Sequence, residues 1–352
     1  MSQFAEALID WQMRHGRHAL PWQGTRDPYR VWLSEIMLQQ TQVDTAIPYY
    51  ERFLARFPTI AALAAAPQAD VLALWSGLGY YARARNLHRA AQRVMSEHGG
   101  RFPESATAIA ELPGIGRSTA AAIAAFCFGA RSAILDGNVK RVLARHFAIE
   151  GFPGARAVEQ RLWSLAESLL PAQDVAIYTQ ALMDLGAMVC TRTRPACTEC
   201  PVAATCLARK QNRQSELPTP RPSRVVPERA TRMLLAWRKG EILLERRPDA
   251  GIWGGLYALP EIPEGVDAET FILTLGLSPC GALEALTPLR HAFTHFRLTI
   301  QPLRCAVTGM GAQEARWHWA DAATWPGLGL PTPVRRLLDA LSLSDDLFAP
   351  PQ

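Results

Sequence analysis

The sequence predicts a multidomain protein in which an all-α domain is followed by an α+β domain. Up to about residue 217, apolar residues recur three and four positions apart with breaks at Pro and Gly, as in successive amphipathic helices. Residues 211–229 are polar and contain four prolines, a composition typical of an extended connector. Beyond them, short apolar runs separated by turns indicate strands. We therefore expect domains over residues 1–210 and 230–345, joined by a linker over residues 211–229.

The first domain is predicted to contain a series of helices. Asp27 is a suitable N-cap, and Pro28 a suitable first residue, for a helix that we expect to run to about Val43. Apolar periodicity places the other expected helices at residues 4–15, 69–75, 82–98, 118–128, 138–147, 158–170 and 176–188. This run of helices makes the domain all-α.

The second domain is predicted to combine strands with a terminal helix. The apolar runs 233–237 and 241–245 flank Arg238-Lys239-Gly240, which is typical of a hairpin. Residues 296–307 and 317–319 are expected to form further strands, and Thr332-Pro333 to begin a helix that reaches about Leu341. This domain is therefore α+β.

The formal net charge of +5 lies entirely before the proline-rich stretch. Residues 1–217 hold 23 Lys and Arg against 18 Asp and Glu, whereas residues 218–352 hold 14 of each. All but three of the basic residues are Arg, which donates two hydrogen bonds to a phosphate at once, although a bias in genomic base usage also produces such an excess. No apolar stretch approaches the roughly 20 residues of a membrane span, and Glu6 and Asp10 argue against an N-terminal targeting peptide.

Four of the seven cysteines fall within 17 residues with the spacing C-x6-C-x2-C-x5-C: Cys190, Cys197, Cys200 and Cys206. Such a cluster indicates a metal site in a reducing compartment rather than a disulfide framework. Four thiolates this close can surround a tetrahedral zinc ion or an iron–sulfur cube. Zinc ribbons usually supply two separated pairs of ligands, whereas this segment has a single close pair. The spacing therefore favours an iron–sulfur cluster, with zinc as the alternative.

A glycine pair lies between two expected helices in Leu112-Pro113-Gly114-Ile115-Gly116-Arg117-Ser118. Two glycines around one apolar residue allow a tight hairpin whose backbone amides lie at a helix N-terminus and suit anions such as phosphate. Asp136 follows 20 residues after Gly116, directly before another expected helix. An Asp at such a place is most often an N-cap.

The order of the glycine hairpin, Asp136 and the cysteine cluster resembles the helix-hairpin-helix DNA glycosylase superfamily, in its iron–sulfur branch. This resemblance implies one 4Fe–4S cluster and places Asp136 in an active site. Members that act as lyases carry a Lys nucleophile at the position aligned with Ser118, and a serine cannot form an imine. The resemblance therefore implies a monofunctional glycosylase.

Glu35 indicates which branch of the superfamily the chain resembles. On a helix it shares a stripe with Val31, Trp32 and Leu38, so that a carboxyl group faces an apolar interior, where Glu is rare without a partner or a purpose. An isolated Glu of this kind is more often capped or extended to solvent. However, residues 32–43 closely resemble the segment of MutY-type adenine DNA glycosylases in which this Glu is the catalytic acid.

Further segments extend the resemblance over nearly all of residues 4–210. Residues 20–22, 77–87 and 180–186 resemble MutY segments, and they imply an adenine pocket containing Trp22 and Gln180. The resemblance also implies DNA contacts, including wedging by Gln40 and Tyr80 with Leu78 beside the lesion. The full set of expected DNA-binding residues is Gly114, Gly116, Gln40, Tyr80, Leu78, Ser118, Asn138, Lys140, Arg192 and Arg194.

Residues 251–257 resemble the opening of the Nudix-like C-terminal domain of MutY-type enzymes. The Glu-rich helix that a working Nudix hydrolase needs is missing after Tyr257, so we expect recognition rather than pyrophosphate hydrolysis. His291-Ala292-Phe293-Thr294-His295 is similar to the family loop that reads 8-oxoguanine, with Thr294 in place of the usual Ser. Phe293, Thr294 and His295 are therefore expected to recognise 8-oxoguanine.

The resemblance implies an adenine DNA glycosylase that excises adenine paired with 8-oxoguanine or guanine. Such an enzyme flips the adenine out of the duplex, protonates it at N7 through Glu35 and stabilises the oxocarbenium-like sugar through Asp136. We expect a cytoplasmic bacterial protein, associated with the nucleoid and monomeric, with duplex DNA as its partner and no membrane. A bifunctional endonuclease III-type glycosylase and AP lyase, and a noncatalytic DNA-binding protein stabilised by a metal, are the alternatives.

Overall fold

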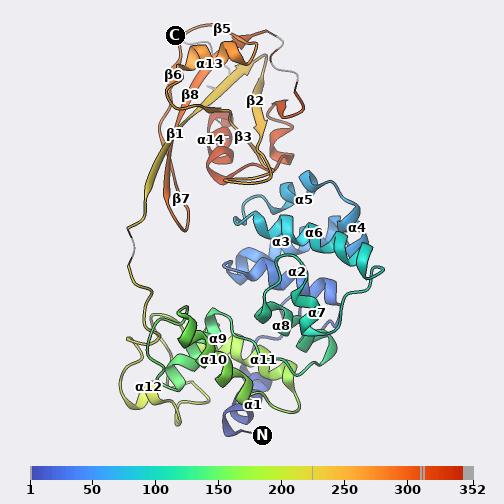
Figure 1. Cartoon of the computed structure of the whole chain (residues 1–352), viewed down its shortest axis with the longest axis vertical. Helices are drawn as coiled ribbons and strands as arrows, with labels where there is room; N and C mark the ends of the chain where they lie inside the picture. Colours follow the sequence, from blue (N-terminus) through green and yellow to red (C-terminus); the bar gives the residue numbers. More distant parts are fainter. Residues whose placement is uncertain (1, 224, 310, 312–313, 344–352) are drawn as a thin grey trace. The chain divides into compact units, whose positions relative to one another are not determined.

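The computed structural model describes residues 2–223, 225–309, 311 and 314–343, and these divide into two compact units. The first unit comprises Met1–Ala65 with Asn86–Ser223, and the second comprises Ala66–Arg85 with Arg224–Gln352 (Figure 1). This division differs from the domain boundaries expected from the sequence at residues 210 and 229, because Ala66–Arg85 packs with the C-terminal part of the chain. The expected outer limits of the domains, residues 1 and 345, lie outside the described residues.

The first unit is helical. Its helices are α1 (Gln3–His15), α2 (Pro28–Leu38), α3 (Val43–Arg56), α4 (Ile60–Ala65), most of α6 (Ala82–Glu97), α7 (Ala106–Ala110), α8 (Arg117–Phe128), α9 (Gly137–His146), α10 (Arg156–Ser168), α11 (Val175–Asp184) and α12 (Leu207–Lys210). Helix α11 continues into a short π-helix, Leu185–Val189, so the helix expected over residues 176–188 changes its winding at Asp184. A shared core packs α1 against α8, α9, α10 and α11.

Helix α2 is shorter than its sequence predicts. It ends at Leu38 and not near Val43, since Gln40 adopts a left-handed backbone with φ of +58° and Gln42 is extended. A second helix, α3, then begins at Val43. The prediction of a single helix to Val43 was wrong because apolar spacing continues across the break, whereas the backbone reverses at Gln40.

The second unit combines helix α5 (Gln68–Trp75) and the first turn of α6 with a sheet. Its strands are β1 (Glu228–Arg238), β2 (Glu241–Arg246), β3 (Tyr257–Ala258), β4 (Glu261–Ile262), β5 (Ser278–Pro279), β6 (Glu284–Ala285), β7 (Leu289–Ala292), β8 (Arg297–Thr308) and β9 (Trp317–Ala320). Strands β1 and β2 form the expected hairpin, where Lys239 and Gly240 both have positive φ. The sheet centre is the parallel pair β1 and β8, in register from Glu228 opposite Arg297 to Trp237 opposite Ala306.

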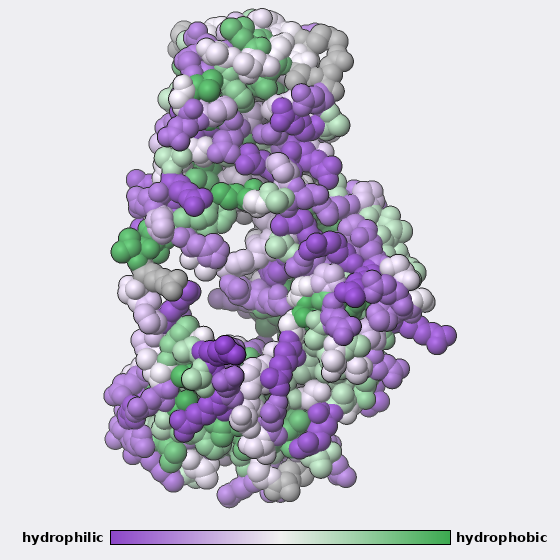
Figure 2. All heavy atoms as spheres, viewed as in Figure 1, coloured by the Kyte–Doolittle hydropathy of each residue, from purple (hydrophilic) through white to green (hydrophobic). Residues whose placement is uncertain are grey.

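Both faces of the β1 strand are buried over residues 233–236. Leu234 and Ala236 belong to a core that includes α13 (Ala268–Thr274), while the alternate residues Met233 and Leu235 are also buried. Helix α14 (Thr332–Leu343) completes the unit. In the described part of the chain, no helix is long and apolar enough to cross a membrane. On the face shown in Figure 2, green hydrophobic residues are scattered among purple hydrophilic ones.

Candidate active site and cysteine-rich loop

Glu35 occupies an apolar environment on helix α2. Its helix neighbours Trp32, Leu33 and Ile36 are all buried. Burial raises the pKa of Glu35 to about 8, and the negative charge of Asp136 adds to this increase. Glu35 therefore holds its proton at neutral pH, and its carboxyl group lies close enough to Asp136 for the two to interact.

Asp136 is the N-cap of helix α9. Its Oδ1 accepts a hydrogen bond of 2.7 Å from the backbone N of Val139. Burial raises the pKa of Asp136 too, but backbone amides and the cations of Arg141 and Lys140 act in the opposite direction. Among the described residues, no donor or cation is found that opposes the raised pKa of Glu35 in this way. Of the two carboxyl groups, Asp136 is therefore the better stabilised as an anion.

Ser118 supports the segment that leads to Asp136. Its Oγ accepts a hydrogen bond of 2.9 Å from the backbone N of Leu135. The hairpin before it has the expected geometry at Gly114, where φ is +78° and an added Cβ would lie 2.6 Å from Asn86 Cβ. Gly116 is the N-cap residue of α8. The structure thus directs the Ser118 hydroxyl toward the active-site backbone.

Lys140 and Asn138 on helix α9 both have protein partners. The Lys140 ammonium lies 2.5 Å from Glu159 Oε1 and is partly buried. Asn138 Oδ1 accepts a hydrogen bond of 2.7 Å from the Arg141 guanidinium. An amine that is already paired in this way must break an ion pair before it can contact a DNA phosphate.

Arg141 connects the active-site helix to the first cysteine. Besides Asn138, its guanidinium donates to the carbonyl oxygens of Gly186 and Cys190, each at 2.8 Å. Gly186 permits this close approach, because an added Cβ would lie 2.5 Å from Asn138 Cβ. Arg141 was not predicted as a site residue. Its position one turn after Gly137, on the helix that Asp136 caps, indicates that it lies near the site.

The two residues expected in an adenine pocket each have a partner within the first unit. Trp22 is buried and packs edge-on against Tyr50, with ring centroids 5.4 Å apart. Gln180 Nε2 donates to Asp184 Oδ1 at 2.9 Å. The fully buried Asp184 was not singled out from the sequence, although an Asp inside the apolar run 181–185 is a signal of the same kind as Glu35.

The expected wedge residues have unusual backbones. Gln40 is exposed with φ of +58°, and Tyr80 is half-exposed with φ of +48°. Leu78 lies in the same loop as Tyr80 but is buried. Gln40 belongs to the first compact unit, whereas Leu78 and Tyr80 belong to the second.

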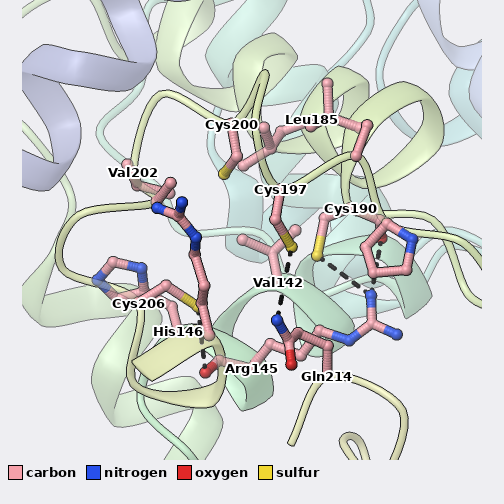
Figure 3. Close-up of a pocket in the computed structure, with 15 residues that line it drawn as sticks. Val142, Arg145, His146, Leu185, Cys190, Cys197, Cys200, Val202, Cys206 and Gln214 are labelled. Carbon is pink, nitrogen blue, oxygen red and sulfur yellow. Dashed lines mark hydrogen bonds between the residues drawn. The ribbon is translucent and has the colours of Figure 1, made fainter. Parts of the chain in front are cut away.

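The four clustered cysteines line one cavity, and none of them forms a disulfide. Figure 3 shows their sulfur atoms directed toward the same space. Among the described residues, no three His, Cys, Asp or Glu side chains are grouped so as to hold a single metal ion. Four cysteine thiols are the ligand set of a 4Fe–4S cluster, so the residues at this cavity fit that group.

Arg145 is buried against this cavity and holds the cysteine-rich loop. Its guanidinium donates to Cys190 Sγ at 3.4 Å, to the Thr191 carbonyl at 2.7 Å and to the Arg192 carbonyl at 2.9 Å. Hydrogen bonds to sulfur stabilise thiolate ligands, so this donor fits a thiolate-bound cluster. The side chains of Arg192 and Arg194 are exposed, as expected for phosphate contacts.

The loop expected to read 8-oxoguanine lies at the end of β7. Phe293 stacks on Phe296 with ring centroids 4.5 Å apart. Thr294 and His295 are exposed, and the Thr294 hydroxyl lies 3.3 Å from the hydroxyl of Tyr80 within the same compact unit. The structure thus brings together a residue expected to wedge into DNA and one expected to read the lesion.

Comparison with protein families confirms the two-part fold. The profile of the HhH-GPD superfamily of base excision DNA repair proteins matches residues 33–168. The profile of the NUDIX domain matches residues 232–340. The helix-hairpin-helix and Nudix-like assignments made from the sequence are therefore confirmed.

Curated relatives and solved structures agree with these matches. An adenine DNA glycosylase of Buchnera aphidicola subsp. Baizongia pistaciae (strain Bp) is 36% identical over 338 residues, covering 95% of each chain. That of Homo sapiens is 34% identical over 371 residues, covering 88% of this chain and 68% of the human one. A thermostable thymine-DNA glycosylase superposes with a TM-score of 0.54 at 29% identity, covering 59% of this chain and 95% of its own. A non-covalent endonuclease III–DNA complex, at 19% identity and a TM-score of 0.51, covers 59% of this chain and 94% of its own and shares the fold.

Proposed function

Because the chain belongs to the family of adenine DNA glycosylases, we propose that it excises adenine paired with 8-oxoguanine or guanine in duplex DNA. The observation that carries this proposal is the pairing of Glu35 with Asp136. These carboxyl groups come from α2 and from the N-cap of α9. Burial raises the pKa of both, but at Asp136 backbone amides and cations oppose the increase, so Glu35 is the better proton donor and Asp136 the better anion. Hydrolysis of a glycosidic bond uses two carboxyl groups with this division of roles.

Access to the adenine requires base flipping. Its N-glycosidic bond cannot be reached inside the stack, so the nucleotide rotates out at a cost of roughly a few kcal/mol, which is lower for a mispair. Gln40 and Tyr80 are assigned to the space that the base leaves, and both are exposed with a left-handed backbone conformation. Trp22 and Gln180 are assigned to the pocket that receives the adenine.

Glu35 acts as the general acid. Adenine leaves poorly as an anion, and a proton placed on N7 lets it depart as a neutral base. With a pKa of about 8, Glu35 is mostly protonated at pH 7 and still acidic enough to donate. An ordinary exposed Glu, ionised above a pKa of about 4.3, has no proton to give at this pH.

Asp136 stabilises the sugar after the base departs. The sugar develops oxocarbenium character, and a fixed carboxylate offsets its positive charge without having to reorganise. The Val139 amide and the nearby cations support the anion of Asp136, and the hydrogen bond from Leu135 to Ser118 fixes the preceding backbone. Because Ser118 has no amine, its position supplies no Schiff base, which supports the assignment as a monofunctional enzyme.

The four cysteines are assigned to one 4Fe–4S cluster. Cys190, Cys197, Cys200 and Cys206 line the cavity, and Arg145 donates to Cys190 Sγ. When bound, such a cluster cross-links the loop through iron–thiolate bonds. The chain's own contribution is to present Arg192 and Arg194 outward, where guanidinium groups suit the phosphates of the DNA backbone. Backbone amides at Gly114 and Gly116 supply a further phosphate site.

The loop of Phe293, Thr294 and His295 is assigned to the oxidised base opposite the adenine. The exposed Thr294 hydroxyl can both donate and accept a hydrogen bond, which allows it to distinguish 8-oxoguanine from guanine. Phe293 holds the loop by stacking on Phe296. Excision of the adenine and reading of its partner are thus assigned to different parts of the chain.

The test is release of free adenine from a duplex with one A:8-oxoguanine pair, measured under single-turnover conditions. The wild-type protein is expected to release adenine, and Glu35→Gln to slow release by about a hundredfold or more, as expected for loss of a general acid. Glu51→Gln, the same change at an exposed site on α3, serves as the control. Wild-type rates in Glu35→Gln, or no adenine release by the wild type, would contradict the proposal.

A further inference from the structure

Residues 247–256, here called the bracket loop, form a tightly closed loop in the second unit. The backbone N of Gly255 bonds to the Arg247 carbonyl, and the N of Arg247 bonds to the Leu256 carbonyl. Trp253 has a left-handed backbone with φ of +57°, and a Cβ at Gly254 would lie 2.2 Å from the Asp249 carbonyl oxygen. The loop therefore has little freedom to change shape.

One side of the bracket loop is attached to the segment Ala66–Arg85 of the same unit. Arg85, in the first turn of α6, donates to the Gly254 carbonyl oxygen at 2.7 Å. On α5, Gln68 Nε2 donates to Asp249 Oδ1 at 3.2 Å. This segment also carries Tyr80, so the bracket loop is fixed to the backbone that positions Tyr80.

The other side of the bracket loop packs on the loop that contains Thr294. Trp253 is buried, and its ring lies 5.9 Å from the ring of Phe293 and 6.0 Å from that of His291. Phe293 directly precedes Thr294, whose hydroxyl reaches Tyr80 at 3.3 Å. The contacts therefore form a closed circuit, by which we mean a ring of neighbours in space or along the chain. Arg85 contacts Gly254, which follows Trp253, and Trp253 packs on Phe293, which precedes Thr294. Thr294 contacts Tyr80, which lies five residues before Arg85.

The two halves of this circuit differ in strength. The contact between the Tyr80 and Thr294 hydroxyl groups is exposed, and water competes for both partners, so it adds little fixed geometry. The bracket loop instead uses a buried aromatic ring and a charged donor to a carbonyl oxygen, which are stronger and more rigid contacts. Arg85 and Trp253 therefore make the stronger of the contacts that connect the Tyr80 segment to the Thr294 loop.

We propose that Arg85 and Trp253 are positioning residues that determine the preference for adenine opposite 8-oxoguanine over adenine opposite guanine. They hold the Thr294 loop at a set distance from Tyr80, so that the hydroxyl group meets the oxidised base when Tyr80 enters the stack. Neither residue is among those assigned above to the adenine or its glycosidic bond. The inference rests on the proposed function, since it assigns the origin of selectivity to that activity.

The experiment measures single-turnover adenine release from two duplexes, one with A:8-oxoguanine and one with A:G. Arg85→Ala and Trp253→Ala are each expected to lower the ratio of the two rates by about tenfold, through slower release opposite 8-oxoguanine. Trp253→Phe retains an aromatic ring and should restore most of the ratio. Arg89→Ala removes an exposed Arg from the same helix, whose guanidinium bonds to Asn86, and is the matched control.

Two outcomes would overturn the inference. One is an unchanged rate ratio in both Arg85→Ala and Trp253→Ala, and the other is a parallel loss on both duplexes, which indicates a general structural role. Thermal melting of each variant identifies a folding defect, and the ratio measured on the folded fraction is insensitive to it. A wild-type protein that releases no adenine from either duplex would instead contradict the proposed function itself.

Discussion

Arg17 and Asp184 form an ion pair between the loop that carries Trp22 and helix α11, with Arg17 Nε 2.8 Å from Asp184 Oδ1. The carboxylate is fully buried and also accepts hydrogen bonds from Gln12 and from the side chain of Gln180. The hydrogen bond to Asp184 uses one N–H of the Gln180 amide and fixes its orientation, which leaves the second N–H and the carbonyl oxygen for other partners. One carboxylate thus holds together both sides of the region assigned to the adenine.

Asp184→Asn is expected to destabilise the protein. The substitution leaves the Arg17 guanidinium without its counter-charge in a largely buried place, which costs about 3 kcal/mol in comparable cases. Urea unfolding should show a lower midpoint with an unchanged slope. Asp10→Asn removes an exposed partner of Arg14 and should change the free energy of unfolding by less than about 0.5 kcal/mol. Equal stability of the two variants would contradict this reading of Asp184.

The rate of adenine release should fall as pH rises through the pKa of Glu35. Because the acid form is the active one and its pKa is about 8, release should be about tenfold slower at pH 9 than at pH 7. Single-turnover rates across this range test the assignment. The residual rate of Glu35→Gln should lack this dependence, and a profile unchanged in that variant would assign the titration to another group.

Glu35 should also make the protein less stable at higher pH. Its pKa in the folded chain is raised above the unfolded value of about 4.5, so the folded state binds more protons between these values and loses stability as pH rises from about 4.5 to 8. Thermal melting of the wild type and of Glu35→Gln across this window measures the contribution. A difference between them that does not change with pH would contradict the raised pKa.

Ser118→Ala should impair both folding and excision. The backbone N–H of Leu135 would lose its acceptor, at a cost of about 1–3 kcal/mol for an unsatisfied buried donor, and the segment before Asp136 would lose a fixed point. Chemical unfolding and single-turnover release measure the two effects. Ser96→Ala, at an exposed site on α6, should alter neither. Release at the wild-type rate in Ser118→Ala would show that this bond does not position Asp136.

Cys197→Ser should remove the metal and weaken DNA binding. Loss of one thiolate ligand is expected to lower the content of iron and acid-labile sulfide, and the freed loop should reduce DNA affinity by roughly tenfold because Arg192 and Arg194 lose their fixed positions. Elemental analysis and a binding titration at fixed salt measure both effects. Cys280→Ser, an exposed cysteine outside the cluster, is the control. Zinc in place of iron in the wild-type protein would contradict the cluster assignment.

Most helices and the strands β1, β2, β8 and β9 could be predicted from local patterns. The N-cap at Asp27, the glycine pair at Gly114 and Gly116 and the turn at Lys239-Gly240 each express a preference of a few neighbouring residues. The end of α2 was predicted wrongly, because an apolar stripe looks the same whether or not the backbone reverses inside it, and short elements such as α4 and β3 were not predicted. The spacing of the four cysteines was likewise sufficient to predict that they share one site.

The partners of the site residues depended on long-range packing. Ser118 lies 17 residues from Leu135 and Arg17 lies 167 from Asp184, and no local period relates either pair. The grouping of Ala66–Arg85 with the C-terminal part of the chain was equally invisible, since it rests on contacts such as Arg85 with Gly254. The order of residues along the chain determines the local backbone preferences and which side chains are buried. The folded chain selects which buried groups meet, because each buried charge or donor needs a partner wherever the chain can supply one.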